Sequence, residues 1–208
     1  MASQEKIAEL LLSTGAVELR PKEPFRFASG ILSPIYCDNR LLLSETEGRG
    51  WIVDSLCEFV DKAKAEQVAG VATAGIAWGA WIAERLKLPF IYIRSSAKEH
   101  GKKNQIEGRV KKGAQIAVIE DLISTGGSVL NAVDEVSKAG AFVVGVFAIF
   151  SYHFKESREA FQKRKIPVHT LVNIDTLLEV AKIEKKIGQA EVDLIRLWQS
   201  DPRNWDQV

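Results

Sequence analysis

The sequence predicts an α/β protein whose central, mostly parallel sheet is flanked by helices. Three observations support this prediction. From residue 68 onward, short apolar runs alternate with stretches whose apolar residues recur at helical spacing. The run at residues 143–150 is apolar throughout, which is typical of a strand covered on both faces. A length of 208 residues fits one ordinary domain with room for a small appendage.

The elements are expected in the following order. Residues 1–12 have the pattern of an amphipathic helix, and residues 20–40 contain enough prolines to favour short strands and turns. A helix is expected at about 46–63. Further strands are predicted at 68–71, 90–93, 116–119, 143–150 and 168–172, and further helices at 76–86, from 129 to a stop near 140, at 175–186 and at 189–198. We expect a single domain over 1–208, with an N-terminal segment (1–45), a core (46–175) and C-terminal helices (176–208).

The composition is that of a soluble globular protein, with 46% hydrophobic and 26% charged residues. The net charge of +1 predicts no global attraction to nucleic acid or to a membrane. No apolar run approaches the ~20 residues needed to cross a bilayer. Cys37 and Cys57 lack the spacing of metal ligands and are expected to be reduced thiols. We therefore expect a cytoplasmic protein that binds neither nucleic acid nor membranes.

Residues 116–128 contain the most informative functional pattern. An apolar strand is expected to end in Glu120 and Asp121 and to lead through a glycine-containing turn into a helix. Gly126 and Gly127 permit close backbone approach, so that amides at the helix start can converge on a phosphate. The glycines are not followed by Gly-Lys-Ser/Thr, which argues against a nucleotide P-loop. Because carboxylates accept hydrogen bonds from sugar hydroxyls, the pattern indicates a phosphorylated ribose. The turn by itself leaves a capped strand–turn–helix with solvated acids as an alternative.

Residues 94–112 form a strongly basic segment. Seven basic residues and two acidic ones give it a net charge of +5. Lys111 and Lys112 are most simply solvated surface residues. Arg94, Lys98 and His100 instead follow a predicted strand, at the end of the sheet where ligands bind in such folds. Cations carried by a flexible lid could stabilise a leaving group as its negative charge develops.

Three separate motifs resemble those of a known family. Residues 118–128 resemble the motif with which type I phosphoribosyltransferases bind 5-phosphoribosyl-1-diphosphate (PRPP). The string Arg94-Ser-Ser-Ala-Lys98-Glu-His100-Gly101 resembles the catalytic loop of the orotate phosphoribosyltransferases, and so does the pattern at residues 25–40 with their N-terminal region. The motifs occur in the family's order within residues 1–185. The resemblance implies a type I phosphoribosyltransferase-like fold, with a small N-terminal hood in 1–45, a PRPP-binding core in 46–175 and a flexible catalytic loop.

The resemblance also implies an activity and a set of site residues. The family forms orotidine 5′-monophosphate and diphosphate from orotate and PRPP, with Mg²⁺ bound mainly through PRPP or diphosphate. Arg94, Lys98 and His100 match positions that contact the diphosphate, and Glu120 and Asp121 match the acids that bind ribose hydroxyls. Lys98, His100 and Asp121 are expected to be catalytic. The remaining PRPP-binding positions are Leu122, Ile123, Ser124, Thr125, Gly126, Gly127 and Ser128, and Ser124 also matches an orotate contact. The family is homodimeric, and residues 94–109 are expected to reach the neighbouring subunit's site.

The sequence departs from part of the family at four positions. Some members carry lysine at the positions of Ala28, Ala74 and Ser95 and an orotate-binding arginine at the position of Tyr152, whereas others also lack these side chains. Orotate is therefore expected to meet backbone amides near Ser29 and Gly30. The alternatives are a purine phosphoribosyltransferase and a non-catalytic, PRPP-sensing regulator of the same fold. The catalytic-loop string argues against the first, and the lack of an extended basic face argues against a nucleic-acid-binding form of the second.

Overall fold

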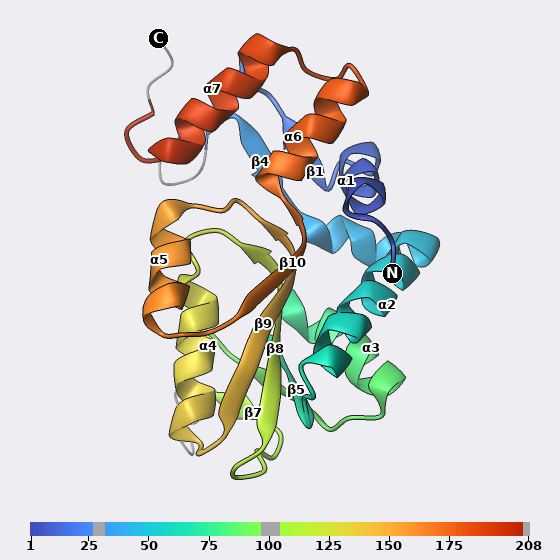
Figure 1. Cartoon of the computed structure of the whole chain (residues 1–208), viewed down its shortest axis with the longest axis vertical. Helices are drawn as coiled ribbons and strands as arrows, with labels where there is room; N and C mark the ends of the chain where they lie inside the picture. The colour runs from blue at the N-terminus through green and yellow to red at the C-terminus, as the bar shows by residue number, and fades with distance from the viewer. Residues whose placement is uncertain (27–31, 97–104, 206–208) are drawn as a thin grey trace.

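The structure is a computed structural model that describes residues 1–26, 32–96 and 105–205 (Figure 1). Its centre is a six-stranded sheet in the order β10-β9-β8-β5-β6-β7. Its strands run parallel, except that β7 is antiparallel to β6 at the edge. The strands are β5 (Gln67–Val71), β6 (Phe90–Ile93), β7 (Ile106–Glu107), β8 (Gln115–Ile123), β9 (Phe142–Ser151) and β10 (Val168–Asn173).

Helices cover both faces of this sheet (Figure 1). The helices α1, α2 and α3 contact one face, and α4 contacts the other. Strand β9 shows why its sequence is apolar throughout: Phe147 and Ile149 pack into one core cluster, while Val146 and Ala148 pack into the other. The helices are α1 (Gln4–Ser13), α2 (Thr46–Lys62), α3 (Gly75–Leu86), α4 (Gly127–Lys138), α5 (Lys155–Lys163), α6 (Ile174–Ile183) and α7 (Gln189–Ser200).

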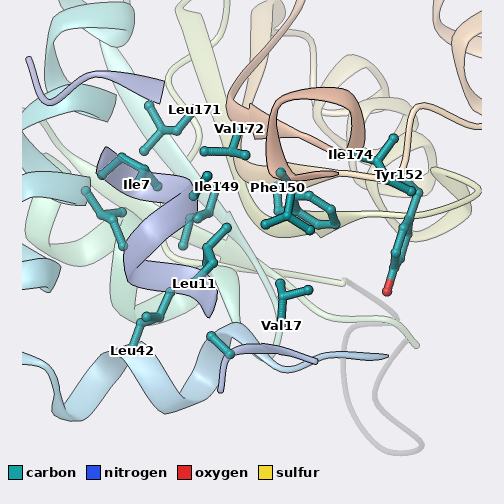
Figure 2. Packing of buried hydrophobic residues seen from close by; sticks show 14 of the residues in the cluster. Ile7, Leu11, Val17, Leu42, Ile149, Phe150, Tyr152, Leu171, Val172 and Ile174 are labelled. Atoms are coloured by element: carbon teal, nitrogen blue, oxygen red, sulfur yellow. The ribbon is translucent and has the colours of Figure 1, made fainter. Parts of the chain in front are cut away.

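The N-terminal segment packs against the carboxyl-end half of the sheet. Two short antiparallel pairs form there, β1 (Val17–Leu19) with β4 (Ile35–Cys37) and β2 (Phe25–Arg26) with β3 (Leu32–Ser33), followed by the 3₁₀ helix η1 (Asn39–Ser44). Figure 2 shows side chains of α1, β1 and η1 packed beside residues of β9 and β10. We call residues 15–44 the hood, of which 27–31 lie outside the described residues. One continuous core therefore fixes the hood relative to the sheet.

The predicted alternation of strands and helices is confirmed, but helix α5 was not predicted and one strand was predicted too short. The strand predicted at 116–119 extends to Ile123, because its ladder with β9 continues through Leu122 opposite Phe150 and Ile123 opposite Ser151. Glu120 and Asp121 therefore lie within the strand and not after it. Within the described residues, no helix has the length and apolar character required to cross a membrane.

Candidate active site

The connection between β8 and α4 forms the centre of the site. Ser124 and Thr125 lie in the turn, and Gly126 adopts a left-handed conformation with φ of 82°. A Cβ atom at Gly126 would lie only 2.9 Å from a ring carbon of Phe161, so both conformation and space require glycine here. Because the N-cap residue has no side chain, the first amides of α4 are not capped by it and can receive an anion.

A pair of acids lies immediately before this turn. Glu120 is 6% exposed, and its Oε1 atom accepts a hydrogen bond of 3.0 Å from the Asp121 amide. Burial, followed by the negative charge of Asp121, raises the pKa of Glu120 to about 9. Burial also raises the pKa of Asp121. In the described part of the chain, neither carboxyl group forms an ion pair with a cation. A buried acid pair without a cation costs stability, which favours a functional role over a structural one.

The loop after β5 approaches the acid pair closely. A Cβ atom at Gly75, the first residue of α3, would lie 2.4 Å from the carbonyl oxygen of Ile119, directly before Glu120. Earlier in the same loop, the peptide bond between Ala72 and Thr73 is cis. The loop after Val71 and the acid pair therefore meet at the carboxyl end of the sheet, where ligands bind in parallel α/β sheets.

A cleft of about 890 Å³ opens on one side of the turn. We call it the large cleft. Its lining comes from four segments: the hood, the end of β8 with its turn, the end of β9 with the start of α5, and the end of α7 with the residues after it. The lining residues are Ser33, Tyr36, Cys37, Leu122, Ser124, Thr125, Tyr152, Phe154, Lys155, Glu156, Glu159, Trp198, Gln199, Ser200, Asp201, Pro202 and Arg203.

Aromatic residues form one wall of the large cleft. The rings of Tyr152 and Phe154 are stacked with centroids 5.2 Å apart, and Trp198 packs edge-on against both. Gln199 anchors this wall, since its Nε2 atom donates a 2.8 Å hydrogen bond to the Tyr152 carbonyl. Tyr152 lies at the margin of the core, beside Phe150 and Ile174 (Figure 2). Desolvation raises the pKa of its hydroxyl, with smaller effects from Cys37 and Tyr36. The hydroxyl is therefore neutral and suited to hydrogen bonding.

A smaller hollow, of about 120 Å³, lies on the other side of the turn. It brings Arg94 and Ser95 together with Ser128, which lies more than thirty residues later in the sequence. The Arg94 guanidinium lies 3.7 Å from the Glu107 carboxylate. The remaining lining residues are Val71, Ala72, Ile93, Asn131 and Ala132.

The structure brings some of the predicted site residues together, whereas others lie outside the described residues. Ser124 and Thr125 line the large cleft and Ser128 lines the small hollow, while Ile123 is 1% exposed, so that only its backbone could reach a ligand. Ser29, Gly30, Lys98 and His100 lie outside the described residues. Sequence reasoning missed the wall formed by residues 198–203, because the apolar spacing of α7 indicates only an ordinary packed helix.

Comparisons with known proteins agree with this geometry. The family described as phosphoribosyl transferase domain matches residues 43–195. The orotate phosphoribosyltransferase of Listeria monocytogenes serotype 4b is 47% identical over 207 residues, which cover 99% of each chain. That of Bacillus pumilus is 50% identical over 199 residues, covering 95% of this chain and 94% of the relative. This chain belongs to the orotate phosphoribosyltransferase family. A solved orotate phosphoribosyltransferase from Aeropyrum pernix has the same fold, with a TM-score of 0.75 and 28% identity over 88% of this chain and 99% of that chain.

The family match divides the site into two parts. The acid pair, the turn and Arg94 lie within the matched residues 43–195. Tyr36 and Cys37 precede the match, and residues 198–203 follow it. In this orotate phosphoribosyltransferase family member, the region that matches the general phosphoribosyl transferase domain therefore contains the acid pair and the turn. The two flanking segments supply much of the large cleft.

Proposed function

We propose that this protein transfers the 5-phosphoribosyl group from PRPP to orotate, giving orotidine 5′-monophosphate and diphosphate. The observation that carries the proposal is the buried acid pair joined to an uncapped helix start beside the large cleft. Membership of the orotate phosphoribosyltransferase family supports the choice of base. The reaction would serve pyrimidine biosynthesis.

The 5′-phosphate is assigned to the turn between β8 and α4. Amides at the start of α4 point along the helix axis, and the helix dipole favours an anion there. The hydroxyls of Ser124, Thr125 and Ser128 add donors around this point. Leu122 and Ile123 would contribute through their backbone.

The ribose hydroxyls are assigned to Glu120 and Asp121. Sugar hydroxyls donate to carboxylates, and each such bond favours the charged form of the acid. PRPP binding should therefore lower the raised pKa values of this pair, which burial and, for Glu120, the charge of Asp121 maintain in the free protein. Asp121 would also stabilise positive charge on the ribose as the bond from C1′ to the diphosphate breaks.

Mg²⁺ would be held mainly by oxygens of PRPP or diphosphate and by water, since the described residues contain no group of three or more side chains that could hold a metal ion by themselves. When bound, the ion would neutralise part of the charge that develops on diphosphate. Arg94 in the small hollow would help to neutralise the same negative charge on diphosphate. Lys98 and His100 are proposed to join it in a closed loop that also excludes water from the reacting sugar.

The base is assigned to the large cleft, where Tyr36 offers an aromatic face that is 36% exposed. Ser124 belongs to the phosphate turn and also lines this cleft. Tyr152 offers a neutral hydroxyl, and backbone amides of Ser29 and Gly30 are proposed to hold the orotate carboxylate. We further propose that the protein is a homodimer in which residues 94–109 reach the partner's site. A cytoplasmic location is also proposed, and the free thiols of Cys37 and Cys57 suit such a reducing compartment.

The test is a base panel. Purified protein is mixed with PRPP, Mg²⁺ and orotate, and the loss of orotate absorbance and the release of diphosphate are followed. Adenine, guanine, hypoxanthine and uracil are assayed in parallel. Orotate-dependent diphosphate release is the expected result. Turnover of a different base would overturn the choice of substrate, and silence with every base would favour a non-catalytic PRPP-sensing regulator.

A further inference from the structure

Asn39 is a fully buried polar residue that joins the hood to strand β8. Its side chain is 0% exposed, and its Nδ2 atom donates a 2.8 Å hydrogen bond to the backbone carbonyl of Asp121, 82 residues away. Its Oδ1 atom lies 3.4 Å from the Cys37 thiol, which donates to it. The donor end of the Asn39 amide therefore bonds to β8, and its acceptor end bonds to Cys37 of the hood.

The bond from Asn39 reaches a part of β8 that has no hydrogen-bonded strand on the β5 side. The ladder between β5 and β8 ends at Gly70 opposite Ile119, so the strand segment that carries Asp121 extends beyond its partner on that side. Asn39 supplies a donor to this segment from outside the sheet. A buried carbonyl that lost its donor would keep the cost of its desolvation and would tend to rotate toward another partner.

The residues beside Asn39 connect its contact with β8 to the large cleft. Asp38 and Arg40 flank Asn39 and form a two-pronged ion pair, with Nε–Oδ1 and Nη2–Oδ2 distances of 2.6 and 2.8 Å. Directly before them, Tyr36 and Cys37 line the large cleft. Residues 36–40 thus run from the cleft to the acid pair.

We propose that Asn39 is a positioning residue, which fixes the Asp121 peptide against the hood and thereby aligns the sugar of PRPP with a base in the large cleft. The inference rests on the proposed function, in which Asp121 contacts the ribose. It adds a residue from outside the general phosphoribosyl transferase region to the control of PRPP binding. A displacement of about 1 Å in a positioned group can cost ~100-fold in rate.

Gln67 offers a matched control at the opposite end of the sheet. Its side chain is 2% exposed, and its Nε2 atom donates a 2.9 Å hydrogen bond to the carbonyl of Arg109, 42 residues away. Gln67→Ala removes the same kind of buried amide-to-carbonyl bond as Asn39→Ala, but at the first residue of β5, at the amino end of the strand. Both variants should lower the melting temperature by similar amounts.

The experiment measures PRPP affinity by calorimetry, and KM and kcat with PRPP and orotate, in the wild type, Asn39→Ala, Asn39→Asp and Gln67→Ala. Asn39→Asp fills the same volume without the donor. We expect both Asn39 variants to bind PRPP about tenfold more weakly and to lose kcat. Gln67→Ala should stay within about twofold of wild type in both PRPP affinity and kcat. Measurements are made below each variant's melting temperature.

The outcomes separate the inference from the function on which it rests. Wild-type PRPP affinity in both folded Asn39 variants would overturn the inference, as would an equal loss in Gln67→Ala. If the wild type binds PRPP but releases no diphosphate with orotate, the proposed reaction fails while the calorimetric comparison still decides the role of Asn39. A wild-type protein that does not bind PRPP would overturn both.

Discussion

The two ends of the parallel sheet are built differently. At the amino end, the four connections that lead from a helix into a strand are short, and each contains one residue in the left-handed conformation: Lys64, Lys87, Gly140 and Lys165. At the carboxyl end lie the buried acids, within the last residues of β8, together with the large cleft and the small hollow. Both ends contain a buried side-chain amide bonded to a distant carbonyl, Gln67 at one and Asn39 at the other.

This difference shows where the chain gives up stability. The amino end uses repeated left-handed turns that close helices and begin strands, and three of these turns place a lysine in that conformation. The carboxyl end keeps Glu120 and Asp121 buried beside each other, although burial raises the pKa of both. Buried acids without a cation occur at the carboxyl end, and such costly burial concentrates at functional sites. Substitutions at the two ends should therefore separate effects on stability from effects on activity.

The largest effect is expected for Asp121→Asn. The amide keeps the shape of the side chain but removes the charge that is proposed to stabilise the ribose, so kcat/KM for PRPP should fall by about 100-fold. The melting temperature should stay the same or rise, because a buried acid is removed. Steady-state kinetics and thermal denaturation check both parts. Wild-type kinetics in this variant would remove Asp121 from the sugar site.

Gly126→Ala should lower both stability and PRPP binding. The alanine would adopt a φ of +82° and press against the ring of Phe161, which should cost about 1–2 kcal/mol of unfolding free energy. The turn that carries the phosphate amides would shift with it, so PRPP affinity should drop several-fold. Chemical denaturation and calorimetry measure the two effects.

Gly140→Ala is the control for that variant at the amino end. Gly140 has a φ of +81°, and a Cβ atom there would meet the flexible side chain of Lys112 at 3.3 Å. The Gly140→Ala variant should lose about as much stability as Gly126→Ala, but its PRPP affinity should be unchanged. A loss of PRPP affinity in both variants would show that the two ends of the sheet are not independent.

Glu120→Gln should change how stability depends on pH. The pKa of Glu120 is about 9 in the folded protein against 4.5 in the unfolded chain, so between these values the folded state binds more protons. Stability from this group is then fully present below pH 4.5 and is lost as the pH rises toward 9. The Asp121 pKa shifts in the same direction.

Replacing the acid with an amide removes this contribution. The variant should therefore unfold with less pH dependence than the wild type, and it should gain a few kcal/mol relative to it at pH 8.5, as an order of magnitude. Denaturation at pH 5.5 and 8.5 provides the measurement. Equal pH slopes for the two proteins would mean that Glu120 is not the group responsible.

The sequence was sufficient to predict the features that depend on neighbours in the chain. The apolar run of β9, the acids before the glycines and the start of α4 are all encoded within a few residues, and each prediction is confirmed in outline. The extension of β8 to Ile123 was missed, because two acids usually end a strand. Here they remain in it, since the ladder with β9 continues past them.

Features that join distant segments could not be predicted. Nothing around Asn39 indicates a partner 82 residues away, and the spacing of α7 does not indicate that Trp198 packs against Tyr152 and Phe154. Such contacts depend on how the hood and the C-terminal helices close over the sheet. Local propensity contains no information about this closure.

The smallest effect is expected at the amino end, for Lys64→Gly. Lys64 has a φ of 54° directly after α2, where its amide bonds to the carbonyl of Asp61. Glycine adopts this conformation without a steric penalty, so the unfolding free energy should rise by ~0.5–1 kcal/mol after the entropy cost of glycine is included. Lys62→Gly removes the same charge within α2, where the residue is helical, and should instead destabilise by about 1 kcal/mol. Chemical denaturation distinguishes these opposite signs. Neither substitution should alter KM for PRPP, because both lie at the end of the sheet away from the acid pair, and a shift in KM would contradict the proposed separation of the two ends.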